Sequence, residues 1–340
     1  ITMYNFLRPL LFRLNPERAH ALTLHTLSFA GRFLPSRKVL EGLYQAHSKP
    51  VTVFGLTFKN PIGLAAGYDK DGIAIRGLAA LGFGHVEVGT VTPKPQPGNP
   101  SPRVFRLVED DAVINRMGFP SRGMEYLEQQ LSGGANWNTV LGVNLGKNKE
   151  TPNEEAVSDY LALLKKFAAY ANYLTINVSS PNTVGLRSLQ GREALEGLLT
   201  QLHQQRLAEQ EKCKKRLPIL VKLAPDLSDA ELSDALEAIL TTNMDGVIVT
   251  NTTLSREGLK SSYREETGGL SGSPLTVKSE AVLRQTLKFV NGKIPVVSAG
   301  GVMNSEDAKR RLDMGAALVQ VYTGLVYRGP GLVKEIVRAL

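Results

Sequence analysis

Eight short apolar runs, rich in β-branched residues and separated by longer amphipathic stretches, constrain the fold of this 340-residue chain more than any other feature. Such runs are typical of buried strands that alternate with helices, and eight βα units predict an α/β fold, the closed (β/α)₈ TIM barrel. The predicted strands cover residues 62–66, 85–89, 140–144, 173–178, 219–223, 246–250, 295–299 and 318–322. We expect a hairpin over residues 51–58 to close the bottom of the barrel. The proline-rich segment after the second strand should be extended rather than helical.

The N-terminal segment carries most of the excess positive charge. The chain has a formal net charge of +8, and the first 50 residues hold seven basic and two acidic side chains, which leaves +5 in this segment. Apolar residues in the first 14 positions follow the spacing of a one-faced helix that contains Pro9. Asn15-Pro16 is then a start signal for a second helix that runs to about residue 30.

We therefore predict a two-helix amphipathic extension over residues 1–45, ahead of a barrel domain over residues 46–340. The basic flanks of these helices fit an anionic membrane surface. Packing of the same helices against the barrel is an equally open interpretation.

Other features limit the class of protein. Cys213 is the single cysteine, which excludes an intramolecular disulfide, and no apolar run reaches the 18 or so residues that a membrane-spanning helix needs. Because a signal-peptide pattern is lacking, we expect a reducing compartment, and Met3 rather than Ile1-Thr2 as the start. The five histidines show no metal-ligand spacing and the chain shows no nucleic-acid reader motif, so we expect neither partner.

Carboxamide side chains follow several of the predicted strands. A carboxamide offers two donors and an acceptor, which suits a flat heterocycle with alternating C=O and N–H groups, whereas asparagine is otherwise depleted in strands. Because the carboxyl ends of barrel strands form one rim, these side chains predict one polar, uncharged recognition surface. The five carboxamides are Asn115, Asn144, Asn177, Asn182 and Asn251.

Two further patterns indicate a charged ligand. Gly300-Gly301 and Gly324 lie in turns after the seventh and eighth strands, where barrels commonly bind phosphate through backbone N–H groups. Lys222 alternates with apolar neighbours in the fifth strand, so it should point into the barrel, where an ammonium needs a partner or a function. Two roles are open for it: the Schiff-base nucleophile of an aldolase, or a fixed charge that stabilises a reduced, anionic cofactor. Lys70 has either a surface ion pair or a binding role.

Six motifs, taken in order, resemble those of the class 2, quinone-dependent dihydroorotate dehydrogenases, close to the bacterial membrane-associated enzymes. The motifs cover residues 60–67, 115–119, 177–182, 221–226, 250–253 and 267–272, and the resemblance spans residues 3–340. It implies a flavoprotein that oxidises (S)-dihydroorotate to orotate in de novo pyrimidine synthesis, with one FMN per chain. A non-enzymatic membrane scaffold built on a decayed barrel would show degraded strand ends, and these are intact.

The resemblance also implies roles for individual residues. The expected FMN contacts are Ala66, Gly67, Thr90, Asn144, Asn177, Lys222, Thr250, Gly272, Gly301, Tyr322 and Thr323, with the phosphate near Gly301 and Thr323. The expected substrate contacts are Lys70, Asn115, Arg116, Met117, Gly118, Phe119, Asn177, Asn182, Asn251 and Thr252. Lys70 would bind the substrate carboxylate, while the carboxamides read the pyrimidine ring.

Ser180 matches the catalytic base of the family, which removes the C5 proton as a hydride passes from C6 to flavin N5. Because a serine hydroxyl is a weak base in water, this role needs a proton relay in a closed, dry site, with residues 179–190 as the lid.

The electron acceptor follows from the same resemblance. Serine rather than cysteine at position 180, together with the basic N-terminus, implies ubiquinone or menaquinone as the oxidant, without a choice between them. It also implies a peripheral place on the cytoplasmic face of the bacterial inner membrane. His20, Arg106 and Tyr322 match positions near the quinone. The sequence says little about oligomeric state, and we expect a monomer.

Overall fold

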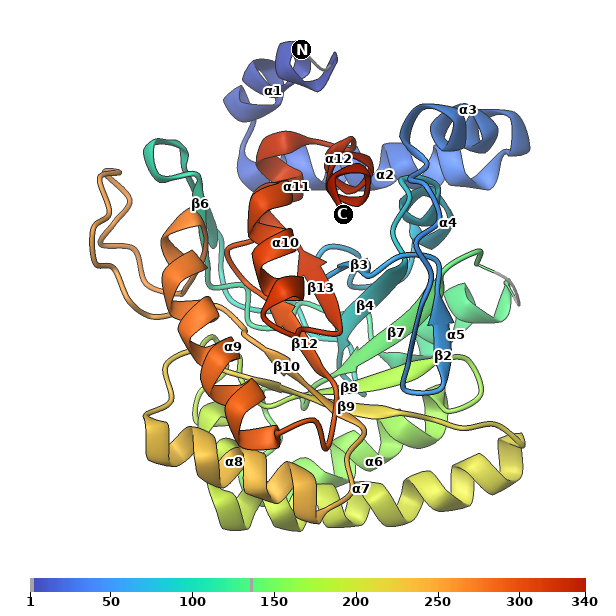
Figure 1. Ribbon diagram of the computed structural model, residues 1–340, viewed down its shortest axis with the longest axis vertical. Helices are drawn as coiled ribbons and strands as arrows, with labels where there is room; N and C mark the ends of the chain where they lie inside the picture. Colours follow the sequence, from blue (N-terminus) through green and yellow to red (C-terminus); the bar gives the residue numbers. More distant parts are fainter. Residues whose placement is uncertain (1–2, 135–136) are drawn as a thin grey trace.

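Eight parallel strands form a closed barrel in the computed structural model, which describes residues 3–134 and 137–340 (Figure 1). The strands are β3 (Ile62–Leu64), β4 (His85–Val91), β7 (Val140–Leu145), β8 (Tyr173–Asn177), β9 (Ile219–Leu223), β10 (Gly246–Val249), β12 (Val296–Ala299) and β13 (Leu318–Val321). The barrel closes where the last strand pairs with the first, with Val319 opposite Ile62. All eight strands lie where the sequence predicts them, so the predicted (β/α)₈ barrel is confirmed. Ile1 and Thr2, which precede the expected start, lie outside the described residues.

Helices cover the outside of the barrel. They are α4 (Ile75–Ala80), α5 (Met124–Ser132), α6 (Ala156–Phe167), α7 (Arg192–Cys213), α8 (Asp229–Thr241), α9 (Thr276–Val290), α10 (Ser305–Asp313), α11 (Thr323–Arg328) and α12 (Leu332–Ala339). Short 3₁₀ turns add η1 (Val108–Asp110), η2 (Asn153–Glu155), η3 (Leu186–Gln190) and η4 (Ser273–Leu275). Local sequence explains their starts: Ser228 and Glu231 form a capping box at α8, because each side chain accepts a hydrogen bond from the backbone N–H of the other residue, at 3.3 and 2.8 Å.

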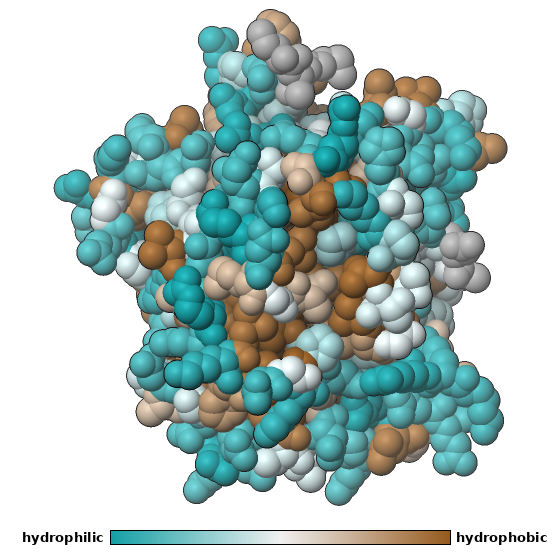
Figure 2. Space-filling view, viewed as in Figure 1, coloured by the Kyte–Doolittle hydropathy of each residue, from teal (hydrophilic) through white to brown (hydrophobic). Residues whose placement is uncertain are grey.

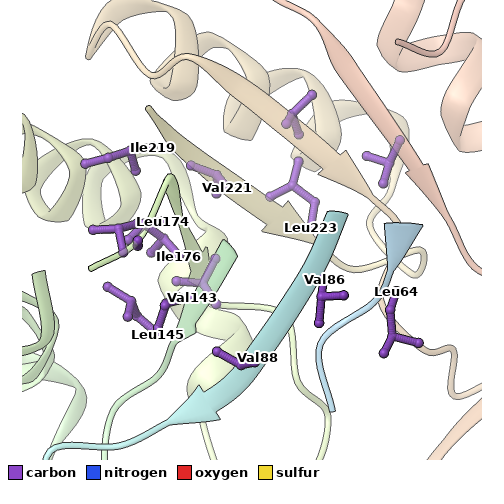
Figure 3. Close-up of a cluster of buried hydrophobic side chains, with 14 of the residues drawn as sticks. Leu64, Val86, Val88, Val143, Leu145, Leu174, Ile176, Ile219, Val221 and Leu223 are labelled. Carbon is purple, nitrogen blue, oxygen red and sulfur yellow. The ribbon is translucent and has the colours of Figure 1, made fainter. Parts of the chain in front are cut away.

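Side chains of the barrel strands alternate between two environments. Leu174 and Ile176 of β8 share one apolar cluster with Leu163 of α6 and Leu198 of α7, so they face the surrounding helices. Figure 3 shows leucine, valine and isoleucine side chains of β3, β4, β7, β8 and β9 in this cluster. Because successive side chains of a strand point to opposite faces, the residues between them point into the barrel. Polar groups at those positions are therefore available to a site inside it.

An apolar layer closes the bottom of the barrel. The predicted hairpin is present as β1 (Val51–Val53) and β2 (Leu56–Phe58), which pair antiparallel. Its Phe54 and Phe58 are buried against Tyr173, Leu220 and Ile248, which come from three barrel strands. This layer leaves the carboxyl ends of the strands as the open end of the barrel.

A small antiparallel sheet stands beside that open end. It consists of β5 (Val104–Leu107), β6 (Ala112–Asn115) and β11 (Gly269–Gly272), in the order β11-β6-β5. The first two strands lie in the long connection after β4 and the third lies after β10. The proline-rich part of that first connection, residues 93–102, contains no helix, as predicted.

The N-terminal extension has three helices, which gather at one edge of the molecule in Figure 1: α1 (Met3–Arg13), α2 (Pro16–Arg32) and α3 (Leu34–Tyr44). The first two were predicted, and Asn15 caps α2 by accepting a hydrogen bond from the backbone N–H of Glu17 at 3.0 Å. The third helix was not predicted. Phe33 has extended backbone between α2 and α3, and a proline stands in the first turn of α3, so the chain restarts a helix after a single-residue break.

The extension packs on the barrel through one face. A Cβ atom at Gly31 of α2 would overlap the backbone of Gly77 in α4, so the two helices approach as closely as glycine allows. The Ser28 hydroxyl donates to the carbonyl of Ile73 at 2.7 Å. Packing on the barrel is thus real, and it leaves the other face of the helices free. In the described part of the chain, no helix is both long enough and apolar enough to cross a membrane.

Candidate active site

A cavity lies at the carboxyl ends of the barrel strands and encloses about 1120 Å³ of empty space, counted to its open mouth. We call it the mouth cavity. Most residues predicted to bind FMN stand on its wall: Ala66, Gly67, Thr90, Asn177, Lys222, Thr250, Gly301, Tyr322 and Thr323. So do most residues predicted to bind substrate: Lys70, Asn115, Met117, Gly118, Phe119, Asn177, Asn182, Asn251 and Thr252. Ser180 also lines it.

Three predicted residues do not line the mouth cavity. Asn144 lies behind the wall and contacts it through Thr90 and Asn177. Gly272 has φ +100°, and a Cβ atom there would come within 3.0 Å of the Thr323 side chain. Arg116 points away, because its guanidinium pairs with Glu266 at 2.5 Å.

The carboxamides form two hydrogen-bonded groups on opposite sides of the cavity. Asn177 Nδ2 donates to Thr90 Oγ1 at 2.9 Å and to Asn144 Oδ1 at 3.1 Å. Asn251 Nδ2 donates to Asn177 Oδ1 at 3.3 Å. On the other side of the cavity, Asn182 Nδ2 donates to Asn115 Oδ1 at 3.2 Å, which joins the lid segment to the small sheet. Four of the five predicted carboxamides thus line one space and Asn144 stands behind its wall, but Lys70 and Lys222 line the same space, so the surface is polar without being uncharged.

Ser180 is buried, with 5% of its surface exposed, and faces this space. The backbone N–H of Asn182 donates to Ser180 Oγ at 3.3 Å. In the described part of the chain this amide is the one hydrogen-bond partner of the hydroxyl, so no histidine or carboxylate activates it directly.

The segment that carries Ser180 is held down by Arg187 of η3. The Arg187 guanidinium donates to the carbonyl oxygens of Ser179 and Thr252, both at 3.0 Å, and to Asp226 Oδ2 at 2.9 Å. Asp226 also accepts from Lys278 Nζ at 2.5 Å. Burial raises the pKa of Asp226, but these hydrogen bonds outweigh it and hold the pKa below its usual value. The lid segment is thereby fixed over the cavity by a charged anchor.

Two lysines supply positive charge to the mouth cavity. Lys222 lies on β9 and points inward as predicted. Burial lowers its pKa, and the negative charge of Glu87 opposes that shift. Lys70 Nζ donates to the carbonyl of Gly67 at 2.8 Å, and burial lowers the pKa of Lys70 to about 8 against the opposing charge of Asp71.

The cavity also offers groups that lack a partner within the protein. Thr250 Oγ1 and Gln320 Oε1 are buried and accept or donate no hydrogen bond within the described residues, although both side chains line the cavity. Gly300 and Gly301 have φ of +91° and +72°, a conformation that side chains other than glycine rarely adopt. Sequence reasoning missed Gln320, although its inward position between Leu318 and Tyr322 was a usable signal.

A second cavity lies between the extension and the barrel, and we call it the extension cavity. It encloses about 1840 Å³ and is lined mainly by apolar side chains of α1, α2 and α11. All three predicted quinone residues, His20, Arg106 and Tyr322, stand on its wall. Burial and the charge of Lys70 lower the pKa of His20 to about 4, so its ring is neutral at physiological pH. Arg106 donates to the carbonyl oxygens at the end of α1, including that of Leu11 at 3.1 Å.

The barrel and its amide-lined mouth define a TIM-barrel enzyme that acts on a small, flat molecule. Residues 49–340 match the family model described as Dihydroorotate dehydrogenase. The chain is 50% identical over 338 residues to the dihydroorotate dehydrogenase (quinone) of Idiomarina loihiensis, covering 99% of this chain and 100% of the relative. It is 49% identical over 341 residues to that of Azotobacter vinelandii, covering 99% and 96%. A crystal structure of DHODH from Eimeria tenella in complex with ferulenol matches with a TM-score of 0.87 and 38% identity, covering 97% of this chain and 93% of that one.

The chain belongs to the dihydroorotate dehydrogenase family, a family of oxidoreductases. Its relatives named above carry the quinone-dependent form of the name, which confirms the class 2 resemblance read from the motifs. This membership gives no support to the aldolase interpretation of Lys222.

Proposed function

We propose that this protein oxidises (S)-dihydroorotate to orotate with one FMN per chain and passes the electrons to a membrane quinone. The observation that carries the proposal is the array of amides around Ser180 in the mouth cavity. An orotate ring presents alternating C=O and N–H groups, which carboxamides match on their two edges. Lys70 on the same wall supplies the positive charge for its carboxylate.

Several features of the mouth cavity itself support FMN binding. The unpartnered Thr250 hydroxyl and the positive charge of Lys222 would meet the polar edge of the flavin ring, and the backbone of Gly301 and the hydroxyl of Thr323 would meet the phosphate. We also assign Ala66, Gly67, Thr90, Asn177 and Tyr322 to this site. Bound FMN would supply the acceptor for the hydride that leaves C6 of dihydroorotate.

Ser180 would take the proton that leaves C5. Its hydroxyl is buried in a segment that Arg187 anchors, so it stands at a fixed place from which bulk water is largely excluded. The hydroxyl accepts the C5 proton while passing its own to a water molecule. The carboxamides and Lys70 hold the ring so that the two leaving hydrogens face different groups.

The extension would connect this chemistry to the membrane. Ten of its large apolar side chains are exposed, among them Phe6 at 72% and Phe29 at 66%, and Figure 2 shows hydrophobic residues on the surface at the upper right, over α3. We propose that residues 1–45 dock on the cytoplasmic face of the inner membrane and that ubiquinone or menaquinone enters the extension cavity, near His20, Arg106 and Tyr322. The protein would act as a monomer.

Anaerobic mixing with dihydroorotate tests the proposal. The purified protein should be yellow, should bleach stoichiometrically when dihydroorotate is added, and should regain its colour when a short-chain quinone is added in detergent. A colourless protein that binds no FMN would refute the flavin part. Bleaching without recovery by quinone would refute the electron acceptor alone.

A further inference from the structure

A buried carboxylate lies inside the barrel, behind the wall of the mouth cavity. Glu87 of β4 is fully buried and accepts four hydrogen bonds from three other strands. Asn144 Nδ2 donates to its Oε1 at 2.8 Å. Tyr173, Thr175 and Gln320 donate to its Oε2 at 3.0, 3.1 and 3.0 Å. Nothing in the sequence motifs drew attention to this residue, and it does not line the cavity.

The hydrogen bonds that start at Glu87 run in one direction toward the cavity. Because a carboxylate only accepts, Asn144 must turn its N–H₂ group to Glu87 and its carbonyl oxygen to Thr90 and Asn177. Those two groups donate to Asn144 Oδ1 at 2.5 and 3.1 Å. The N–H₂ group of Asn177 is then fully used, so its carbonyl oxygen faces Asn251, which donates to it at 3.3 Å. The other end of the chain has anchors of its own, because the backbone N–H of Ser179 donates to Asn177 Oδ1 at 3.3 Å and that of Thr252 donates to Asn251 Oδ1 at 2.8 Å. Asn144 therefore lies between Glu87 on one side and an already oriented Asn177 on the other.

The surroundings of Glu87 keep this direction fixed. Burial, and then the charge of Glu87, raise the pKa of Tyr173 well above its usual value, so the phenol keeps its proton and donates. The negative charge of Glu87 raises the pKa of Lys222 against the larger effect of burial, so the two side chains lie near each other. A buried carboxylate with four donors and a positive neighbour is a compensated charge, which makes it a stable origin for the array.

We propose that Glu87 is a positioning residue that accepts from the N–H₂ group of Asn144 and so holds Asn144 in the orientation in which its oxygen accepts from Thr90 and Asn177, which supports the hydrogen-bond pattern that the mouth cavity presents to a flat heterocycle. The identity of that heterocycle as dihydroorotate or orotate rests on the proposed function. Without the carboxylate, the buried N–H₂ group of Asn144 loses its acceptor, and a flip of Asn144 that regained one would set its N–H₂ group against that of Asn177. The ring would then meet a mixture of matching and mismatched amides.

An exchange of acid and amide tests this direction. In Glu87→Gln, one carboxylate oxygen becomes an N–H₂ group, so either Asn144 loses its acceptor or the donors Tyr173, Thr175 and Gln320 meet an N–H₂ group. In Asn144→Asp, two carboxylates face each other. In the double variant Glu87→Gln/Asn144→Asp, the new glutamine donates to the new aspartate, whose oxygens still accept from Thr90 and Asn177. One buried charge and the original direction are both restored.

Orotate affinity is the main readout, measured by titrating the flavin absorbance of the FMN-loaded protein. Each single variant should bind orotate at least about tenfold more weakly than the parent, because a buried polar group loses its partner. The double variant should recover most of that loss. Unchanged affinity in Glu87→Gln, or losses in the double variant that simply multiply those of the singles, would overturn the proposal.

Tyr173→Phe is the matched control. It also removes a hydrogen bond to Glu87 in the barrel interior, but it keeps the carboxylate and three donors, so orotate affinity should stay within about twofold of the parent. An equal loss in this variant would mean that general loosening, rather than direction, sets the affinity, and the proposal would fall.

A second readout separates this proposal from the proposed function. Thermal unfolding of the FMN-free protein needs no substrate, and the double variant should recover most of the melting temperature that the two singles lose. If the parent protein binds no orotate, the proposed function fails, and this recovery still decides the role of Glu87. Failure of the double variant to fold at all would overturn the proposal, since the exchange is expected to restore the array.

Discussion

The mouth cavity and the extension cavity meet at a shared wall but are lined by side chains of opposite character. Amides and two lysines line the first, whereas leucine, valine and tyrosine side chains are the most frequent on the wall of the second. Five residues belong to both walls: Lys70, Val104, Val113, Met117 and Tyr322. Directional hydrogen bonds discriminate strongly between similar ligands, while an apolar cavity discriminates weakly by size and shape. The mouth cavity should therefore be the strict site and the extension cavity the permissive one, and the wall between them is about one side chain thick.

The largest expected effect falls on the strict site alone. Ser180→Ala should slow flavin reduction by dihydroorotate by about 10²- to 10⁴-fold, because the proton acceptor is lost, while orotate affinity stays nearly unchanged. Anaerobic stopped-flow reduction measures the rate, and quinone reoxidation of chemically reduced protein should remain normal. Val184→Ala, at an 88% exposed position of the same segment, is the control and should match the parent.

Ser180→Cys sharpens this prediction. If the cysteine variant reduced its flavin as fast as the parent, the serine would not distinguish this class from its cysteine-containing relatives. The proposed class-specific role of the hydroxyl would then be contradicted.

The next effect concerns the exposed apolar face of the extension, which we propose binds the membrane. The double variant Phe29→Asp/Leu34→Asp should bind anionic vesicles at least about a hundredfold more weakly, because each lost side chain contributes roughly 1.5 kcal/mol when it leaves water. Both positions are more than half exposed, at 66% and 56%, so folding should be unaffected. Flotation with vesicles measures binding, and flavin reduction should not change.

Val277→Asp provides the comparison for that experiment. Val277 is 80% exposed on α9, away from the extension, and its replacement should leave vesicle binding intact. Equal losses in the two variants would show that charge anywhere on the surface, and not the apolar face of the extension, controls binding.

Lys70 stands on both walls, and its titration should affect only the strict site. Because its pKa is lowered to about 8, the charged form that binds a carboxylate dominates below pH 8 and is lost above it. Orotate affinity should therefore be flat up to about pH 7.5 and fall by up to tenfold per pH unit from about pH 8.5 upward. Lys70→Arg, which stays charged, should abolish the fall, whereas a persistent fall in that variant would assign the titration to another group.

The smallest effect is expected at the lid anchor. Arg187→Lys should slow flavin reduction several-fold, because lysine can reach Asp226 but cannot also donate to the carbonyl oxygens of Ser179 and Thr252. The control is Arg192→Lys, whose side chain is half exposed and lies 3.8 Å from Asp234. A rate loss as large as that of Ser180→Ala would mean that the anchor takes part in chemistry rather than in positioning.

The fold and much of the strict site could be predicted from sequence because periodicity and strand ends determine them. Apolar β-branched runs gave all eight strands, and the inward position of Lys222 followed from alternation alone. Asn115 and Arg116 show where this reasoning stops. They are neighbours in extended backbone, so their side chains point to opposite sides, and only Asn115 reaches the cavity.

What the sequence did not reveal depends on contacts between distant segments. Glu87 sits in an apolar run like any buried polar residue, and its importance emerges only when donors from three other strands converge on it. The third helix of the extension was missed because a single extended residue, Phe33, separates it from the second. The extension cavity likewise depends on how α1 and α2 lie over the barrel, which no local pattern specifies.

The hairpin that seals the bottom of the barrel limits the routes by which ligands can reach its interior. Because Phe54 and Phe58 pack among side chains of the barrel strands, the barrel interior is open only at the carboxyl ends of its strands. Ligands of the mouth cavity must therefore enter and leave at the carboxyl ends of the strands, beside the extension cavity that shares five wall residues with it. The chemical character of each cavity, and not its position at an opposite end of the barrel, then determines which molecule it admits. A barrel closed at its bottom in this way could place the extension on a lipid surface and still exchange water-soluble molecules with the solvent at the open end of the barrel.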